Sequence, residues 1–356
     1  MLTLTKAELK EFAVNLLLAA KSSSEDAEIV SESLIWADLR ARHGHGMFVR
    51  LPNLIQRLVR GLICSPAKMY WTPIAPAAHL LDADFGFGQV AACLAMDKAI
   101  ALSKTEGIGL VAVRHSNHYG AASYYCARAA EAGCIGFAFT NSVAKVAPFG
   151  GRKPVLGTNP VGFGCPTPSG VPVLVDFSTS AIAGSSVWDI SATGGQLPTG
   201  AALDVDGQPT TDPSAVAEGC LLPAAGPKGF GLGLMVEILS GVLTGAAIGR
   251  EVGSLLHTWD RPTDTGHLFI AIQIDGFLPE ELFLDRLKRL LGWIAECPRQ
   301  SGGQPIRYPG QLRGQYGVRY ERDGIPVDER AVHLLNRLAD EFNVKRLSEE
   351  PSLAAS

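Results

Sequence analysis

The sequence predicts an α/β protein that begins with a small helical subdomain. Two observations indicate the class: strand and helix patterns alternate up to residue 140, and glycines then cluster around short apolar segments. With 356 residues, 47% of them hydrophobic, the chain can bury a large core. In the alternating part we expect a helix over 89–103, a strand over 108–113, a helix over 121–132 and a strand over 135–140.

Three short helices are predicted before residue 62. Thr5 followed by Glu8 has the spacing of a capping box, and Ser22 followed by Glu25 repeats that start signal. Apolar side chains then recur on one helical face in each segment, and the third helix is expected to stop at Gly61. These helices predict a subdomain over residues 1–70.

The second half of the chain mixes turns with longer elements. The glycine-rich stretch 141–233 predicts loops that present backbone to a ligand. The apolar stretch 229–249 contains Glu237 and internal glycines, which favours a buried helix over a membrane span. We expect a helix over 231–243, a strand over 267–274, amphipathic helices over 280–294 and 328–342, and a disordered tail over 348–356.

Charge and cysteine usage narrow the function classes. The net charge is −4 without any basic run, so neither nucleic acid nor an anionic membrane surface is an expected partner. An anionic substrate would have to meet individually placed arginines or lysines. Seven cysteines lie scattered without C-x-x-C spacing, and residues 1–10 lack the apolar segment of a signal peptide. These features predict a cytoplasmic protein.

Residues 86–91, Gly-Phe-Gly-Gln-Val-Ala, match the G-x-G-x-x-A pattern of dinucleotide-binding loops. A Rossmann site also requires a carboxylate after the second strand, and that strand instead ends at Arg114 and His115. We therefore interpret the motif as a tight structural turn.

Two histidines occupy positions suited to chemistry. Gly44 and Gly46 flank His45, which leaves the imidazole accessible to act as a general acid, although a helix-capping loop histidine has the same pattern. His118 follows an apolar strand, and the helix start at 120–124 offers free N–H groups to a phosphate. A metal site built from His43, His45, His115 and His118 is a weaker alternative, because no carboxylate lies nearby in the sequence.

Other polar residues each carry two interpretations. Thr158 and Asn159 either bind a substrate carboxylate or belong to an ordinary turn. Asp176 ends an apolar strand, where it either orients an imidazole or caps the next helix. Lys228 precedes an apolar helix and either binds a phosphate or ribose or is solvated.

Taken in order, these segments resemble the malate/L-lactate dehydrogenase type 2 family, which includes L-sulfolactate, ureidoglycolate and 2,3-diketogulonate oxidoreductases and Δ1-piperideine-2-carboxylate reductases. The resemblance runs from about residue 5 to residue 344. It rests on the segments 37–40 with 45–46, 116–120, 156–160, 176–180, 197–200, 210–213, 228–231 and 308–310.

The resemblance implies a three-layer, non-Rossmann α/β domain with a mixed sheet of about seven strands, plus the helical subdomain, in a homodimer. Within this fold we expect a substrate-side domain over 71–125 and 305–347 and a cofactor-binding domain over 126–304. The implied activity is hydride transfer between C4 of NAD or NADP and C2 of a small 2-oxo or 2-hydroxy acid. The alternative substrate is a cyclic 2-imino acid.

The resemblance also assigns roles to residues. His45 corresponds to the proton donor with Asp176 behind it, His118 lies beside the nicotinamide, and Arg50 pairs with the substrate carboxylate. The implied cofactor contacts are Gly120, Ala121, Ala122, Ser123, Tyr124, Ser142, Leu156, Gly157, Thr158, Asp176, Phe177, Ser178, Thr179, Ser180, Lys228, Gly229, Pro309 and Gly310.

The chain departs from the family pattern at two positions. Gly44 replaces the usual serine before the histidine, so a Ser-His-Asp relay is incomplete. Arg50 follows the histidine by five residues instead of four, so either the loop has one extra residue or the carboxylate anchor has moved. Two further classes stay open at this point: a metal-dependent hydrolase or lyase using the four histidines, and a binding protein that has lost catalysis.

Overall fold

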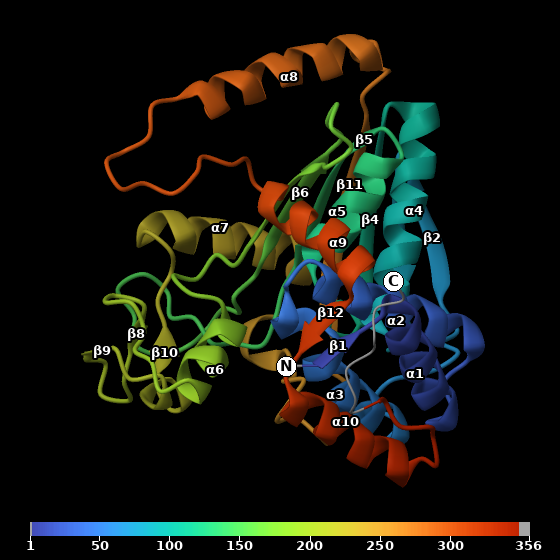
Figure 1. The fold of residues 1–356 in the computed structure, drawn as a ribbon, viewed down its shortest axis with the longest axis vertical. Helices are drawn as coiled ribbons and strands as arrows, with labels where there is room; N and C mark the ends of the chain where they lie inside the picture. The colour runs from blue at the N-terminus through green and yellow to red at the C-terminus, as the bar shows by residue number, and fades with distance from the viewer. Residues whose placement is uncertain (1, 349–356) are drawn as a thin grey trace.

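The computed structural model describes residues 2–348 and confirms the α/β class (Figure 1). A seven-stranded sheet runs through the centre in the order β2-β3-β4-β11-β5-β6-β7. Only β3 and β4 are parallel, so the sheet is mixed, as the family resemblance implied. Its strands are β2 (Tyr70–Ala75), β3 (Ala78–Asp82), β4 (Ile108–Ser116), β5 (Cys134–Thr140), β6 (Val161–Cys165), β7 (Val173–Phe177) and β11 (Thr265–Gln273).

Helices cover both faces of this sheet and make the three layers. Helices α4 (Gly88–Glu106) and α5 (Ala122–Glu131) pack on one face, against inward side chains such as Val111 and Val113. Helix α7 (Pro227–Glu237) and a π-helical turn (Ile238–Val242) pack on the other, against Ala112. Because side chains alternate along a strand, the buried part of β4 is covered on both faces, which explains the apolar run over residues 108–113.

The two ends of the chain together form the helical subdomain. Helices α1 (Lys6–Ala19), α2 (Ser24–Leu39) and α3 (Met47–Val59) share one core with the segment around α10 (Glu329–Glu341). Strand β1 (Leu2–Leu4) pairs with β12 (Ile325–Val327), so the C-terminal part of the expected substrate-side domain packs on the N-terminal helices. The sheet itself takes strands from both sides of residue 126.

The predicted start of α1 is confirmed, and that of α2 shifts by one residue. Thr5 and Glu8 form the complete capping box. At α2 the cap is Ser23, whose hydroxyl accepts the Asp26 N–H, whereas the sequence indicated Ser22 and Glu25. Helix α9 (Gln311–Asp323) was not predicted, because it is strongly polar and buries only Gly317 and Tyr320.

The glycines of the G-x-G-x-x-A motif make room for protein. A side chain on Gly88 would lie 2.0 Å from the Asn117 carbonyl oxygen. The Asn117 side chain also donates to the carbonyl groups of Phe85 and Gly86. The turn is therefore filled by residues 117–118, in agreement with the structural interpretation of the motif.

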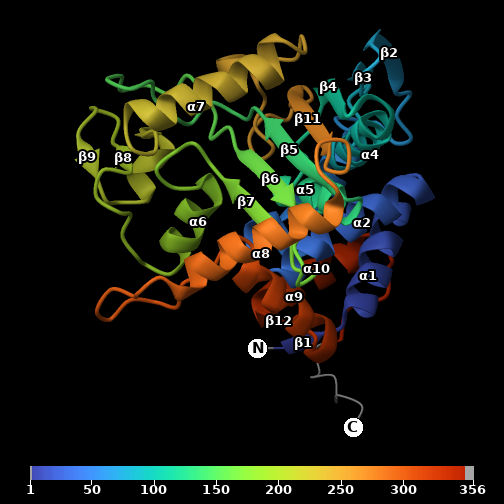
Figure 2. The same cartoon turned by 90° about the horizontal axis from the view of Figure 1, so that it is seen from above.

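Several elements surround the sheet at its β7 side (Figures 1 and 2). They are α6 (Gly184–Ala192) and a small sheet of β8 (Ala202–Leu203), β9 (Pro209–Thr210) and β10 (Cys220–Leu221). Short 3-10 turns occur at His43–His45, Ser214–Ala217 and Gly249–Glu251.

Two helices leave apolar side chains exposed. The expectation of a buried helix over the apolar stretch is only half right, since α7 and the π-helical turn expose Leu232, Met235, Ile238 and Val242. Helix α8 (Glu280–Glu296) stands apart from the body on extended connections (Figure 1). None of its residues is buried, and its Trp293 is 67% exposed.

Within residues 2–348, no helix combines the length and apolar character needed to cross a bilayer. The predicted disorder of the tail concerns positions that, apart from Ser348, lie outside the described residues.

Candidate active site

The turn His43–His45 is held by a buried carboxylate at the end of α2. Asp38 accepts the Met47 N–H at 2.7 Å and contacts His43 Nδ1 at 3.4 Å. A side chain on Gly46 would collide with this carboxylate, so glycine is required there. Burial raises the pKa of Asp38, while the contacts with His43 and Met47 lower it. Asp38 thus fixes the loop that carries His45, a role that the sequence reasoning did not assign.

His45 and His118 come together in the structure. Their rings stack with centroids 5.8 Å apart and an interplanar angle of 14°. His118 Nδ1 accepts the Gly120 N–H at 3.3 Å, so in the neutral ring the hydrogen sits on Nε2. His45 Nδ1 is buried and has no hydrogen-bond partner within the described part of the chain.

Both imidazoles are held in the neutral form. Burial is the largest cause that lowers the pKa of His45 well below its usual value, and the charges of Arg50, His118, Arg42 and Arg313 lower it further. Burial likewise lowers the pKa of His118, again with a contribution from Arg50. Each ring can therefore accept a proton, or donate a hydrogen bond, at neutral pH.

Arg50 lies on α3, next to the two histidines. Its Nε donates to the Gly44 carbonyl at 2.7 Å, which fixes the guanidinium and leaves both terminal NH2 groups available. Burial lowers the pKa of Arg50 to about 10. No carboxylate of residues 2–348 forms an ion pair with it. The arrangement can receive a carboxylate from a ligand in a bidentate contact.

Lys145 is a further cation of this region, and the sequence reasoning missed it. Its backbone bridges two segments, donating to Leu156 and accepting from Leu221. Burial lowers the pKa of Lys145, and the charge of Arg50 adds to the effect. The only sequence signal is a lone lysine inside the apolar run Val143 to Ala147, which is weak without the fold.

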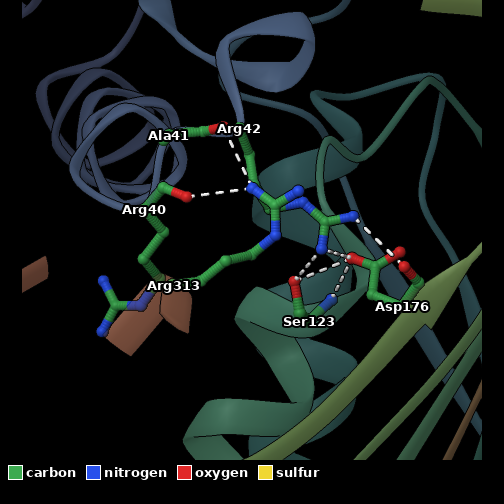
Figure 3. Close-up of polar contacts among 6 residues, drawn as sticks. All are labelled: Arg40, Ala41, Arg42, Ser123, Asp176 and Arg313. Atoms are coloured by element: carbon green, nitrogen blue, oxygen red, sulfur yellow. Dashed lines mark hydrogen bonds and ion pairs between the residues drawn. The ribbon is translucent and has the colours of Figure 1, made fainter. Parts of the chain in front are cut away.

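Asp176 pairs with Arg42 and Ser123 (Figure 3). Arg42 Nη1 lies 2.7 Å from Asp176 Oδ2, and the same oxygen accepts the Ser123 hydroxyl at 2.7 Å and the Ser123 N–H at 2.9 Å. The direct support of His45 by Asp176 that the resemblance implied is absent from residues 2–348. Asp176 instead holds Arg42, three residues before His45 in the same loop.

Three of the five N–H groups of residues 120–124, which were expected to be free for a phosphate, are used within the protein. The N–H of Gly120 bonds to His118, that of Ser123 to Asp176, and that of Tyr124 to the Ala121 carbonyl. Ala121, Ala122 and Tyr124 are buried in the core between the helices and the sheet. The start of α5 is thus a protein contact, and it positions His118 and Asp176.

A cleft of about 600 Å³ opens beside the Arg42–Asp176 pair. Arg313 closes one side, where its Nη1 donates to the carbonyl groups of Arg40 and Ala41 at 3.0 Å each (Figure 3). The predicted cofactor residues in its lining are Ser123, Asp176, Phe177, Pro309 and Gly310, whereas His45 and His118 do not line it. Three arginines against one aspartate, in a volume typical of ligand pockets, fit a ligand that carries phosphates.

The loops 141–145 and 156–160 lie side by side. Ser142 Oγ accepts the Thr158 N–H at 3.0 Å, and a side chain on Gly157 would strike Ser142. Asn159 is fully buried: it accepts the Ser142 N–H and donates to Gly233 and Glu237. Because its amide is fully engaged, the expected contact of Asn159 with a substrate carboxylate is corrected to a structural role. Thr158 stays partly exposed.

Glu237 ties these loops together from α7. Its buried carboxylate accepts hydrogen bonds from the side chains of Asn141 and Asn159 and from the Gly249 N–H. The sequence indicated Glu237 only as an argument against a membrane span. In the structure it positions both glycine-rich loops, since each loop contributes one of the amides.

The remaining predicted cofactor residues lie in the segments next to these loops. Leu156, Thr179, Ser180 and Gly229 are buried, while Lys228 is exposed at the start of α7. A side chain on Gly229 would lie 2.2 Å from the Ala224 carbonyl, so this glycine is needed for packing. Ser178 donates to the Ser180 carbonyl at 3.4 Å.

The four histidines of the metal alternative separate into different contacts. His43 pairs with Asp38 and His115 with Asp82, so that only His45 and His118 face each other. Within residues 2–348, no group of three or more His, Cys, Asp or Glu side chains is placed to hold a metal ion.

The fold and the site together define the class of protein, which is an α/β enzyme. Its site holds two neutral histidines next to cationic side chains that have no carboxylate partner among residues 2–348. The family of malate/L-lactate dehydrogenases matches residues 4–336. The malate dehydrogenase of Pyrococcus abyssi is 37% identical over 350 residues, covering 96% of this chain and 95% of that one. The ureidoglycolate dehydrogenase (NAD(+)) of Escherichia coli O157:H7 is 35% identical, covering 86% and 87%.

A solved structure agrees with these relatives. The Δ1-piperideine-2-carboxylate reductase of Pseudomonas syringae pvar. tomato superimposes with a TM-score of 0.86 and 31% identity, covering 95% of this chain and all of that one. The chain therefore belongs to the malate/L-lactate dehydrogenase family and is an oxidoreductase. The family inferred from the sequence motifs is confirmed.

Proposed function

We propose that the protein transfers a hydride between C4 of NAD or NADP and C2 of a small 2-oxo or 2-hydroxy acid. The observation that carries this proposal is the pair of neutral imidazoles, His45 and His118, next to the unpaired guanidinium of Arg50. When bound, the nicotinamide supplies or accepts the hydride. The chain has to bind the acid, move one proton and exclude water.

Arg50 is the proposed anchor of the substrate carboxylate. Its Nε is already bonded to the Gly44 carbonyl, so the guanidinium is oriented before the substrate arrives. The bidentate contact would place C2 and its oxygen next to the histidine pair. The Gly44 carbonyl belongs to the His43–His45 turn, so the turn that carries His45 also orients Arg50.

The two histidines divide the proton chemistry. His118 carries its hydrogen on Nε2, so it can donate a hydrogen bond to the substrate oxygen and polarise the C2–O bond. His45 has a free ring nitrogen and exchanges the proton with the substrate oxygen. Asp176 acts on this site as a positioning residue by holding Arg42 in the loop of His45.

The cofactor would be held by two regions. Ser142 and Thr158, whose hydroxyls contact each other at 3.3 Å, are proposed for one region, and the arginine-lined cleft with Ser123, Phe177, Pro309 and Gly310 suits the phosphate-bearing part. Lys228 and the segment 176–180, of which Thr179 and Ser180 are buried, complete the proposed contacts. NAD and NADP both belong in the test.

We propose that the protein is a homodimer and that it works in the cytoplasm. Exposed apolar side chains on α7, on the π-helical turn and on the detached helix α8 support a second copy as their partner. All seven cysteines are free thiols, which supports a reducing compartment. Sedimentation or light scattering measures the subunit count, and a monomer at working concentration would contradict the dimer.

A substrate panel tests the proposed activity. Pyruvate, oxaloacetate, diketogulonate and Δ1-piperideine-2-carboxylate are each mixed with NADH or NADPH, and the loss of reduced nicotinamide is followed by absorbance. Ureidoglycolate is already a 2-hydroxy acid, so it is mixed with NAD or NADP and the gain of reduced nicotinamide is followed. We expect turnover with a 2-oxo acid that is unaffected by a chelator. Binding without turnover for every pair would contradict the proposal, and turnover confined to the cyclic imine would move the substrate to the C=N class.

A further inference from the structure

Two cations, Arg50 and Lys145, border the same small region and have no carboxylate partner within residues 2–348. Both side chains are shielded from solvent enough for burial to lower their pKa values. The ion pairs among the described residues all involve other side chains. Two shielded cations without an anion are costly, because each loses hydration without compensation. One substrate carboxylate on Arg50 would leave Lys145 unpaired.

The start of helix α6 lies next to both Lys145 and the loop that binds Arg50. Lys145 Nζ lies 3.8 Å from the position of a Cβ on Gly184, and the Thr158 methyl lies 3.9 Å from it. The next residue, Ser185, touches the position of a Cβ on Gly44, whose carbonyl binds Arg50. Consecutive residues of one helix thus contact the lysine and the arginine loop. Lys145 and the loop that binds Arg50 therefore meet at the start of α6, where the charge of Arg50 also acts on Lys145.

We propose that Lys145 is a specificity-determining residue that binds a second anionic group of the substrate, which makes the substrate a dianionic 2-oxo or 2-hydroxy acid such as a dicarboxylate. This inference rests on the proposed function and deepens it. Arg50 holds the carboxylate next to C2, and Lys145 meets the distal group beside Thr158. The positive end of the α6 helix dipole lies next to Lys145 and adds to the preference for negative charge.

The test compares K145M with the wild type on oxaloacetate and pyruvate. These substrates share the 2-oxo carboxylate and differ in the distal anionic group. A hydrogen-bonded charge contact contributes about 1.5–3 kcal/mol, so we expect KM for oxaloacetate to rise about 10- to 100-fold, with KM for pyruvate nearly unchanged. K145R should keep the preference. K153M removes an exposed lysine from the same segment of the chain and should change neither value.

Two further measurements distinguish a substrate contact of Lys145 from a contact with the cofactor. Titration of NADH into K145M should leave Kd unchanged if Lys145 binds the substrate, whereas loss of a contact with a cofactor phosphate would weaken NADH binding. Calorimetry with malonate and acetate measures the same preference without turnover, and so applies even if no substrate of the panel reacts. Equal losses for oxaloacetate and pyruvate, a weaker Kd for NADH, or malonate binding unchanged in K145M would overturn the proposal.

Discussion

Ser185 fills the space that a side chain at Gly44 would need: its Cβ and hydroxyl lie 2.7 and 2.9 Å from the position of a Cβ on residue 44. The family serine is therefore sterically incompatible with this α6. We expect G44S to lower the free energy of unfolding by about 1–3 kcal/mol, as overpacking does, and to reduce turnover by displacing His45. Urea unfolding and kinetics of G44S and G44S/S185G check this: the double variant should recover, and a fully stable, active G44S would contradict it.

The Arg42–Asp176 ion pair should behave as one coupled unit. Both side chains are largely buried, at 13% and 7% exposure, so D176N leaves the Arg42 charge without its partner. Breaking a buried pair costs about 3–5 kcal/mol. We expect D176N and R42M each to destabilise the protein by roughly this amount, and R42M/D176N by clearly less than the sum. Additive losses in a double-mutant cycle would show that the pair is not coupled.

The pH dependence of catalysis should follow the lowered pKa of His45. A base is active when unprotonated, so kcat/KM for oxidation should stay level as the pH falls through the ordinary histidine value of 6.5 and decline only below it. In the reductive direction, kcat/KM should rise toward low pH. R50M removes one cause of the lowered pKa of His45. The fall of kcat/KM for oxidation at low pH should therefore begin at a higher pH in R50M, whatever the variant does to substrate binding. An unmoved limb in R50M would contradict this assignment.

His267 should make the fold sensitive to acid. It is fully buried between Thr140 and Ser116, and burial lowers its pKa to about 3. Between the unfolded value of 6.5 and this value, only the unfolded chain takes up the proton, so stability falls as the pH falls. The slope for one such group is about 1.4 kcal/mol per pH unit. H267Q should be less stable at neutral pH but lose stability less steeply in acid, and a parallel slope would contradict this role.

The sequence predicted the class of fold because periodicity records which faces of an element are buried. The helix 89–103 and the strand 135–140 were found because their neighbours cover them regularly. Helix α9 was not predicted because its contacts involve arginines and glycines, which leave no periodic pattern of apolar residues in the sequence. The mixed sheet of about seven strands was implied by the family resemblance, but its strand order was not predicted, since β11 inserts between β4 and β5 from more than a hundred residues away.

The site was predictable residue by residue only where a glycine or an isolated charge marked a loop. His45 and His118 stand in such loops, and the fold brings them together. The hydrogen-bond or ion-pair partner of each polar side chain was not predictable from the sequence. Asp176 binds Arg42, and Asn159 binds Glu237. These partners come from segments that are remote in the chain, and only the fold brings them together. Lys145 was missed for the same reason, since its importance arises only from its proximity to Arg50.

The central claim is that His45 exchanges the proton during hydride transfer, and H45A tests it most directly. Single-turnover oxidation of NADH is measured with the best acid of the panel, together with Kd for NADH, with H257A as the control for an exposed histidine. Loss of a general acid lowers the rate about 10²- to 10⁴-fold, and we predict such a loss in H45A, with Kd for NADH nearly unchanged. A single-turnover rate equal to that of H257A would contradict the account.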